Sequence, residues 1–209
     1  VTYSSNLDSD SEGLGTVLHT NRFLAVADGA ETITSLYDED DNDLGARVGD
    51  AFTISAMSGG STYEEILTID ETTTLEDLRA EIEVVLDQID PAVDVNITTD
   101  GQIEIDTTGI ADPAFEINSL QVQSNRPGSN SFIANAFSFP PTIQENQTAQ
   151  TMTIRRPAVA TDSLADVVDG TGSSLGLEDG DEISINGAVG GQTIPTGTNT
   201  YSADATDPT

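Results

Sequence analysis

The chain contains an internal repeat that aligns without a gap. Residues 44–60 and 175–191 match at a constant offset of 131 positions, and seven of the 17 aligned positions are identical. The identical positions include a Leu-Gly pair, a Gly-Asp pair and a Gly-Gly pair. Upstream, residues 35–38 resemble residues 163–166 with a three-residue difference in length. Because a repeated segment of this kind is typical of one supersecondary unit used twice, the sequence predicts a duplicated module.

Glycine-containing turns place a strand inside each copy of the repeat. A Gly-Asp step supplies the positive φ that starts a hairpin strand, and a Gly-Gly pair ends it. This pattern predicts strands at residues 51–56 in the first copy and at residues 182–187 in the second. Residues 63–70 are predicted to form the next strand of the first copy.

A helix is predicted immediately after these strands, over residues 75–89. Its apolar residues recur at helical spacing. Thr74 and Asp77 resemble a capping box, and Pro91 lies just past the expected end of the helix. The apolar positions are Leu75, Leu78, Ile82, Val85, Leu86 and Ile89.

More β structure is predicted on the C-terminal side of this helix. Residues 93–105 alternate between apolar and polar on both sides of the turn Asp100-Gly101, which predicts a hairpin. Residues 115–122 predict another strand or two.

The next part of the chain is interpreted as a connection. Residues 124–141 are rich in Asn and Ser and predict a crossing segment, with Phe132, Phe137 and Phe139 as anchors. Residues 151–154 predict a short strand, followed by Arg-Arg-Pro as a rim.

These elements indicate a mainly β protein with one short helix per module. This is a β-rich α+β class, with outer domains of sandwich or barrel-like type. We expect residues 1–33 to leave an inner domain and form the first strands, and residues 34–123 to form module one. Residues 124–160 are expected to connect and return, and residues 161–209 to begin a truncated module two.

The net charge excludes several classes of partner. The chain has 37 acidic and 6 basic residues, a formal net charge of -31, and it contains no Lys. Such a field repels nucleic acid and anionic membrane surfaces. We interpret most of the acidity as a solvated surface suited to a salty external medium, and a cation-binding role is the alternative.

The chain carries no cysteine and no recognisable targeting segment. The absence of Cys excludes a disulfide framework and a thiolate metal site. No apolar run is long enough to span a bilayer, and residues 1–13 lack the features of a signal peptide. We interpret both ends as cuts, and expect module two to continue beyond Thr209 with a Leu-rich, capped helix.

One acidic loop is the best candidate for binding a cation. Asp38, Asp40 and Asn42 place oxygen-bearing side chains at alternating positions, as Ca²⁺ prefers. The loop lacks the central Gly and the distal Glu of an EF-hand, so a solvated hairpin turn is the alternative. A calcium titration followed by melting temperature separates the two, because no shift at millimolar calcium would reject the site.

The sequence offers no other convincing chemistry. His19 is the single histidine and no nucleophile motif accompanies it, so we predict no catalytic residue and no cofactor. Asn96 and Asn146 each begin a triplet that matches the glycosylation acceptor pattern. Asn96 falls on a predicted strand, which favours a structural role for it.

Several motifs together resemble the modules of one family. Residues 35–45 (SLYDEDDNDLG), residues 49–60 (GDAFTISAMSGG) and residues 73–89 (TTLEDLRAEIEVVLDQI) resemble outer domains of bacterial flagellar hook proteins. Related modules occur in flagellins. Residues 154–191, which run from Ile-Arg-Arg-Pro to the Leu-Gly-Leu and Gly-Asp motifs, are similar to the hook version.

This resemblance implies a structural subunit of the curved extracellular tube that transmits motor torque to the flagellar filament. The implied partners are copies of the chain itself in a helical lattice and other flagellar axial proteins. The resemblance implies no enzymatic activity. A flagellin or an adhesin-type extracellular β module that binds a ligand or cation is the alternative, and a carboxylate-based hydrolase ranks last.

Overall fold

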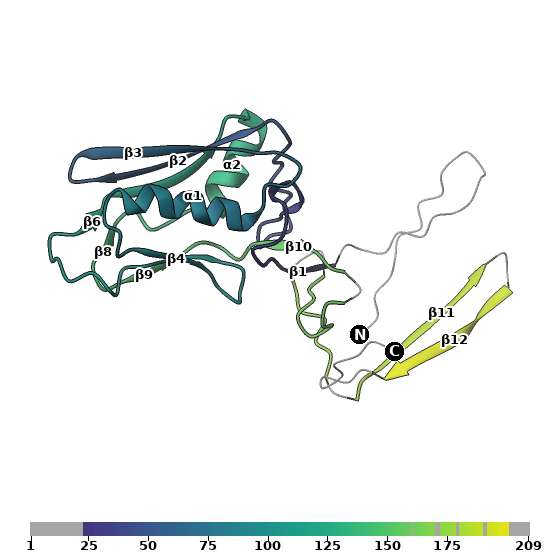
Figure 1. Ribbon diagram of the computed structural model, residues 1–209. Helices are drawn as coiled ribbons and strands as arrows, with labels where there is room; N and C mark the ends of the chain where they lie inside the picture. The colour runs from purple at the N-terminus through teal and green to yellow at the C-terminus, as the bar shows by residue number, and fades with distance from the viewer. Residues whose placement is uncertain (1–22, 160, 170–171, 179, 190–191, 201–209) are drawn as a thin grey trace.

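The computed structural model describes residues 23–159, 161–169, 172–178, 180–189 and 192–200. Within these residues the fold is mainly β with two α-helices and a 3-10 turn at Ile33–Ser35, which confirms the predicted β-rich α+β class. Figure 1 shows a larger lobe that holds both helices and, apart from it, the hairpin of β11 and β12. The short strands β1 and β10 lie side by side at the neck between them.

The first sheet of the larger lobe is antiparallel, with the strand order β3-β2-β7. Its strands are β2 (Ala51–Ser58), β3 (Ser61–Thr68) and β7 (Ser119–Ser124). Burial alternates along residues 51–57 of β2 and along β7, which is the pattern of a sheet with one face against a core. The strands predicted at residues 51–56 and 63–70 are confirmed with small changes in their ends.

A two-residue turn joins β2 to β3. Gly59 and Gly60 have φ values of 57° and 82°, and Ser58 lies opposite Ser61 in the ladder. Turns with two positive φ angles match the twist of a hairpin, and glycine adopts them without steric cost. The Gly-Gly pair therefore ends β2 as predicted, and it also starts β3.

The predicted helix is α1 (Leu75–Asp87), which ends two residues earlier than expected. Thr74 Oγ1 accepts a hydrogen bond from Asp77 N at 3.2 Å, and Thr74 N donates to Asp77 Oδ2 at 2.8 Å. These reciprocal bonds confirm the predicted capping box. The buried residues of α1 are Leu75, Leu78, Ile82, Val85 and Leu86.

A second antiparallel sheet has the strand order β4-β5-β9. Its strands are β4 (Asp94–Ile97), β5 (Ile103–Asp106) and β9 (Thr148–Gln150), and β4 and β5 form the hairpin predicted around Asp100-Gly101. Helix α1 packs against both sheets and lies between them in Figure 1. The predicted sandwich or barrel-like core therefore takes the form of two small sheets with a helix between.

A second helix, α2 (Pro127–Ala136), occupies most of the predicted crossing segment and corrects that interpretation. Gly, Ser and Asn are poor helix formers, so the local sequence gives little helical signal. Packing against β7 supplies the stability, because Ile133 and Ala136 are fully buried. Phe137 and Phe139 are buried anchors as predicted, whereas Phe132 is 38% exposed.

The predicted strand at residues 151–154 is wrong, because these residues form no strand. Strands lie on both sides of it instead, as β9 and as β10 (Arg155–Pro157), so the predicted rim is a strand. The remaining strands of the larger lobe are β6 (Glu116–Ile117) and β8 (Ile143–Gln144), which pair with each other.

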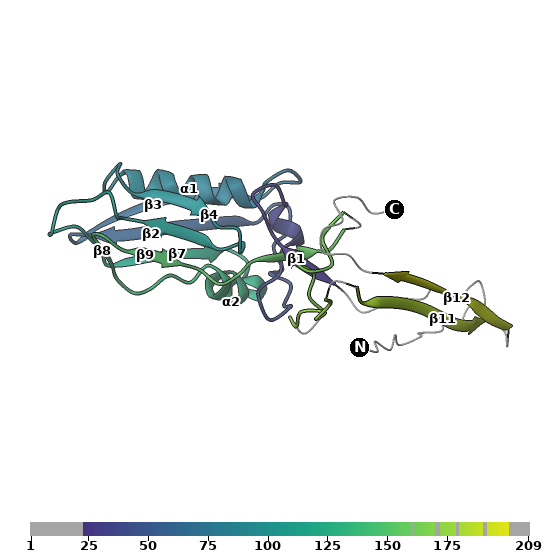
Figure 2. The same cartoon turned by 90° about the horizontal axis from the view of Figure 1, so that it is seen from below.

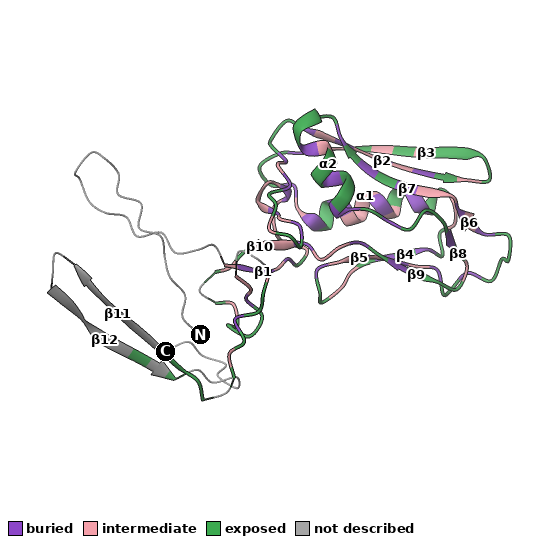
Figure 3. Cartoon of the chain, turned by 180° about the vertical axis from the view of Figure 1, so that it is seen from behind, coloured by how far each residue is buried: buried purple, intermediate pink, exposed green. Residues whose placement is uncertain are grey.

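One hydrophobic core runs through the larger lobe from Ala27 to Ile154. It includes Ile133 and Ile143, which lie in the part of the chain predicted to be a connection. Figure 3 shows the buried residues on the inward sides of α1, α2 and the strands. This continuity favours a module boundary at β10 in place of the boundary near Ser124.

The second copy of the repeat supplies β11 (Glu182–Val189) and β12 (Gln192–Thr200), which form an antiparallel hairpin. The strand predicted at residues 182–187 is confirmed and is two residues longer. Figure 2 shows this hairpin extending away from the larger lobe. Among the described residues, no helix is long and apolar enough to cross a membrane.

Candidate functional site

The neck between the two modules combines backbone hydrogen bonds with a cluster of charged side chains. At its centre β1 (Leu24–Val26) pairs antiparallel with β10, and Ala25 lies opposite Arg156. Ala27 N donates to Ile154 O at 2.9 Å, and Ala158 N donates to Phe23 O at 2.9 Å. The strand that leads into module one and the strand that leads into module two are therefore held side by side.

Each strand of this pair also forms backbone hydrogen bonds along its outer edge. Leu24 N donates to Val168 O at 3.0 Å, and Val168 N donates to Leu24 O at 2.8 Å. On the other side, Arg155 N donates to Tyr37 O at 2.9 Å, and Tyr37 N donates to Arg155 O at 2.8 Å. The neck is thus four backbone segments wide, and two of those segments come from the loops of the modules.

Arg156 binds carboxylates from both modules. Its Nη1 and Nη2 donate to the two carboxylate oxygens of Asp162 at 2.7 and 2.6 Å. Its Nε lies 2.5 Å from Glu31 Oε1 as an ion pair, without the alignment of a hydrogen bond. All three side chains are less than one fifth exposed. The hydrogen bonds from Arg156 hold the pKa of Asp162 below its usual value.

The carboxylates of Glu31 and Asp162 also accept hydrogen bonds from the backbone of nearby turns. Glu31 Oε2 accepts from Asp28 N at 2.8 Å, and Asp162 Oδ2 accepts from Val159 N at 2.7 Å. Burial raises the pKa of Glu31, and the neighbouring Asp28 carboxyl adds to the rise. Backbone donation from Ala30 N lowers the pKa of Asp28. Each acidic group therefore has a defined structural partner.

A second ion pair, in which the carboxylate is buried and the arginine is partly exposed, lies within module one. Arg126 Nη2 donates to Asp50 Oδ1 at 2.6 Å, and Arg126 Nε lies 2.9 Å from each oxygen of that carboxylate. Asp50 is the second residue of the Gly-Asp turn before β2, and Arg126 precedes α2. This pair ties the two elements together, and the hydrogen bonds from Arg126 lower the pKa of Asp50.

The predicted calcium loop has its leading carboxylate occupied by hydrogen bonds. Asp38 is buried, and its Oδ1 accepts from Asp40 N at 3.0 Å and from Asn42 N at 2.9 Å. The Asn42 side-chain amide donates to both oxygens of Asp38. These hydrogen bonds are those of an Asx turn, which matches the alternative prediction of a solvated hairpin turn.

The second module forms the same turn with almost no acidic residues. Asp169 replaces Asp38, and its Oδ1 accepts from Ser173 N at 3.1 Å. Gly172 has a φ of 75°, close to the 63° of Asp41 at the equivalent position. The same backbone turn therefore forms around a single carboxylate in module two. Calcium binding at Asp38, Asp40 and Asn42 stays a prediction for the titration described above.

The other residues singled out from the sequence are His19, Asn96 and Asn146. His19 falls outside the described residues. Asn96 is exposed on β4, and Asn146 is exposed in a turn with a φ of 54°. Glycosylation of either residue stays a prediction. Within the described ranges, no group of three or more His, Cys, Asp or Glu side chains is arranged to hold a metal ion.

The larger lobe has two shallow surface grooves. One, of about 540 Å³, is lined by Asp28, Glu76, Arg79 and residues 95–99. Arg79 is already bound there, because it contacts Glu76 at 2.8 Å and Glu83 at 2.6 Å and donates to Val95 O at 3.0 Å. The other groove, of about 420 Å³, runs between β7 and the residues after α2. Neither groove brings together an acid and a base that lack structural partners.

The sequence did not reveal the neck. Leu-Ala-Val in β1 and Arg-Arg-Pro in β10 share no residue, and each strand is only three residues long. The usable signal was the offset of the repeat, because residues 155–157 follow residues 24–26 by the same 131 positions.

Comparisons with known proteins give little likeness. No family model and no curated protein matches the chain. One solved structure, the crystal structure of the Helicobacter pylori flagellar hook protein FlgE2, aligns with a TM-score of 0.38 and 12% sequence identity. The alignment covers 75% of this chain and 28% of that chain, so this chain spans much less than the length of that hook protein.

Proposed function

We propose that this chain is a structural, non-enzymatic segment of a bacterial flagellar hook. Its modules would be outer domains of the curved extracellular tube that transmits motor torque to the filament. The observation that carries the proposal is the repeated unit of an acidic or polar loop, a Gly-Asp turn and a hairpin. These are the segments whose motifs resemble hook modules, and they take the same backbone form at Gly49 and Gly180, with φ values of 91° and 90°.

The use of the charged side chains supports a structural role. Arg156 joins Glu31 and Asp162 across the neck, and Arg126 joins Asp50 across module one. Side chains that bind one another in this way hold elements in place and are not available to activate a substrate. Their arrangement is that of a scaffold.

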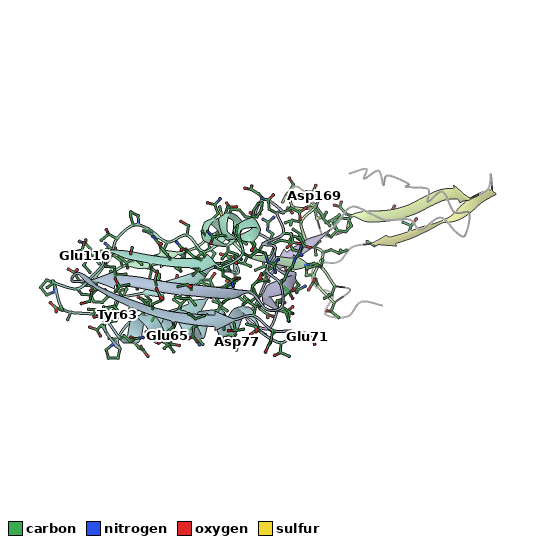
Figure 4. The ribbon with its side chains drawn as sticks, turned by 90° about the horizontal axis from the view of Figure 1, so that it is seen from above. Tyr63, Glu65, Glu71, Asp77, Glu116 and Asp169 are labelled. Atoms are coloured by element: carbon green, nitrogen blue, oxygen red, sulfur yellow. The ribbon has the colours of Figure 1, made fainter. Side chains whose placement is uncertain are left out.

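The acidic exterior supports a place on the outside of an assembly. Glu71 and Asp77 are exposed on the larger lobe, where Figure 4 labels them. A high net charge of one sign keeps neighbouring surfaces apart except where specific contacts form. The partners in this proposal are copies of the chain in a helical lattice and other flagellar axial proteins.

Electron microscopy of native flagella with an antibody raised against this chain tests the proposal. The expected result is label confined to the short curved segment between cell and filament, and removed when the antibody is preincubated with the purified chain. Label along the filament would reject the hook and support the flagellin alternative. Label scattered over the cell surface would reject it in favour of an adhesin.

A further inference from the structure

The repeat extends well beyond the motifs in the sequence. Asp38 N donates to Asn42 O at 3.0 Å, and the residues 131 positions later, Asp169 and Ser173, form the same bond at 2.9 Å. Ser35 N donates to Thr32 O at 3.0 Å, as Asp166 N does to Ser163 O. The offset therefore holds upstream, and the three-residue length difference expected there is wrong.

The same offset relates the two strands of the neck. Residues 24–26 of β1 correspond to residues 155–157 of β10, and each strand leads directly into its own module. In the antiparallel pair, Leu24 lies opposite Pro157 and Val26 lies opposite Arg155. Ala25 lies opposite its own counterpart, Arg156. A local pseudo-two-fold axis therefore passes between these two residues.

The hydrogen bonds of the neck obey this symmetry. The bond from Ala27 to Ile154 corresponds to the bond from Ala158 to Phe23, and both measure 2.9 Å. The reciprocal pair formed by Leu24 with Val168 corresponds to the pair formed by Arg155 with Tyr37. Every bond on one side of the axis in this set has a partner on the other side.

The partners in these bonds are crossed between modules. Leu24 belongs to the strand that leads into module one, but it pairs with Val168 of module two. Arg155 leads into module two, but it pairs with Tyr37 of module one. We propose that the two modules dock on each other by exchanging their lead strands: the backbone at Tyr37 holds the strand that leads into module two, and the backbone at Val168 holds the strand that leads into module one.

The charged groups of the neck fit such an interface. Glu31 and Asp162 are equivalent by the offset, and each caps an equivalent backbone amide, of Asp28 and Val159. The side chains do not share the symmetry of the backbone, and at the centre Arg156 faces Ala25. One arginine can serve both carboxylates, whereas two arginines opposite each other at the axis would repel. The interface thus combines a repeated backbone with a single shared cation.

This inference is independent of the hook proposal, because it depends only on contacts within the chain. Disulfide formation tests it directly, since the native sequence has no cysteine. Cysteines are introduced into the full chain in pairs. Four positions are used, and they are combined in two ways to give four double variants. The exchanged combinations are Leu24→Cys with Val168→Cys and Tyr37→Cys with Arg155→Cys. The control combinations use the same four substitutions recombined within modules, Leu24→Cys with Tyr37→Cys and Arg155→Cys with Val168→Cys.

The geometry separates the two combinations. Residues that exchange two hydrogen bonds in an antiparallel pair have Cα atoms about 5.5 Å apart, within the range of a disulfide. The recombined residues lie two strands apart, roughly 9–10 Å, which is beyond that range. Mild oxidation followed by intact mass should therefore show a disulfide in the exchanged pairs and free thiols in the controls.

Each other outcome overturns the proposal. Disulfides in the control pairs would mean that each lead strand pairs within its own module or that the neck has no fixed pairing. Free thiols in every pair would mean that the neck does not form. Tyr37 and Arg155 are only partly buried, so their pair decides the question even if substitution of the buried Leu24 prevents folding.

Discussion

The two modules share their turns but differ in what surrounds them. In module one the hairpin of β2 and β3 pairs with β7 and packs against α1. In module two the described hairpin of β11 and β12 forms a two-stranded sheet. Both hairpins follow the same Gly-Asp turn, with Asp50 N bonded to Arg47 O and Asp181 N bonded to Glu178 O, each at 3.0 Å. The repeated segment therefore specifies a local shape, and other segments supply the core of module one.

The largest expected difference between the modules is in stability, when a side chain is removed from the hydrophobic core of module one. Leu78→Ala removes a fully buried side chain of α1, and should reduce the unfolding free energy of module one by about 2–5 kcal/mol. Val84→Ala, at a 45% exposed position of the same helix, is the matched control and should cost far less. Urea unfolding with hydrogen exchange on both modules measures the effect. Equal losses in the two variants would show that α1 does not form the core.

Loss of the shared cation should affect the neck before either module. Arg156→Ala leaves Glu31 and Asp162 partly buried without their partner, which should cost about 1–3 kcal/mol. Amide exchange at Leu24, Tyr37, Arg155 and Val168 should accelerate together, while exchange in β4 and β5 stays unchanged. Arg47→Ala removes the same charge from an exposed position and should leave these amides protected. Unchanged exchange rates at these four amides in the Arg156 variant would contradict a role of Arg156 in holding the neck together.

The equivalent aspartates of the two Gly-Asp turns should respond differently. Asp50 is buried against Arg126, whereas Asp181 is exposed, so Asp50→Asn should cost about 1–2 kcal/mol and Asp181→Asn a few tenths. Because the pKa of Asp50 is lowered in the folded state, its contribution is present above the ordinary carboxyl pKa. It is lost as the pH falls through the lowered value.

Thermal melting from about pH 5 to pH 2 measures this contribution. Asp50→Asn should reduce the acid-induced loss of stability, and Asp181→Asn should not. The same acid response in both variants would mean that the ion pair of Asp50 with Arg126 contributes nothing.

Glycine substitutions should have effects of opposite sign in the turns and in α2. Gly49 and Gly180 have φ near 90° with no atom near an added Cβ, so alanine at either site should cost roughly 1–2 kcal/mol through the backbone alone. Gly128 also has open space but lies in α2 at an ordinary φ, and Gly128→Ala should stabilise slightly. Chemical denaturation of the three variants checks the signs. A neutral Gly180→Ala would indicate that the two turns are not equivalent.

Local signals made part of this fold predictable. Thr74 and Asp77 marked the start of α1, Gly59-Gly60 marked the β2–β3 turn, and the repeat located β11. Helix α2 was missed because its stability comes from burial against β7 and not from its own residues. The neck was missed because a three-residue strand carries no periodic pattern and its partners are more than 100 residues away.

The acidic loop shows the limit for site prediction. Its residues predict a cation site, and calcium binding there stays a prediction. The matching turn of module two, which has Gly172 and Ser173 in place of acidic and amide side chains, could not be predicted from those residues. A sequence pattern shows which side chains carry oxygen atoms that could bind a cation. The structure is needed to show which hydrogen bonds those atoms already accept.

Helical reconstruction of native hooks by electron microscopy tests the central claim most directly. The account predicts that each subunit carries two lobes on the outside of the tube, and that the larger lobe contains α1 between two small sheets. It also predicts that a paired-strand neck, with Arg156 between Glu31 and Asp162, joins the lobes. A hook map whose outer density cannot hold this chain, or holds it without the paired neck, would contradict the account.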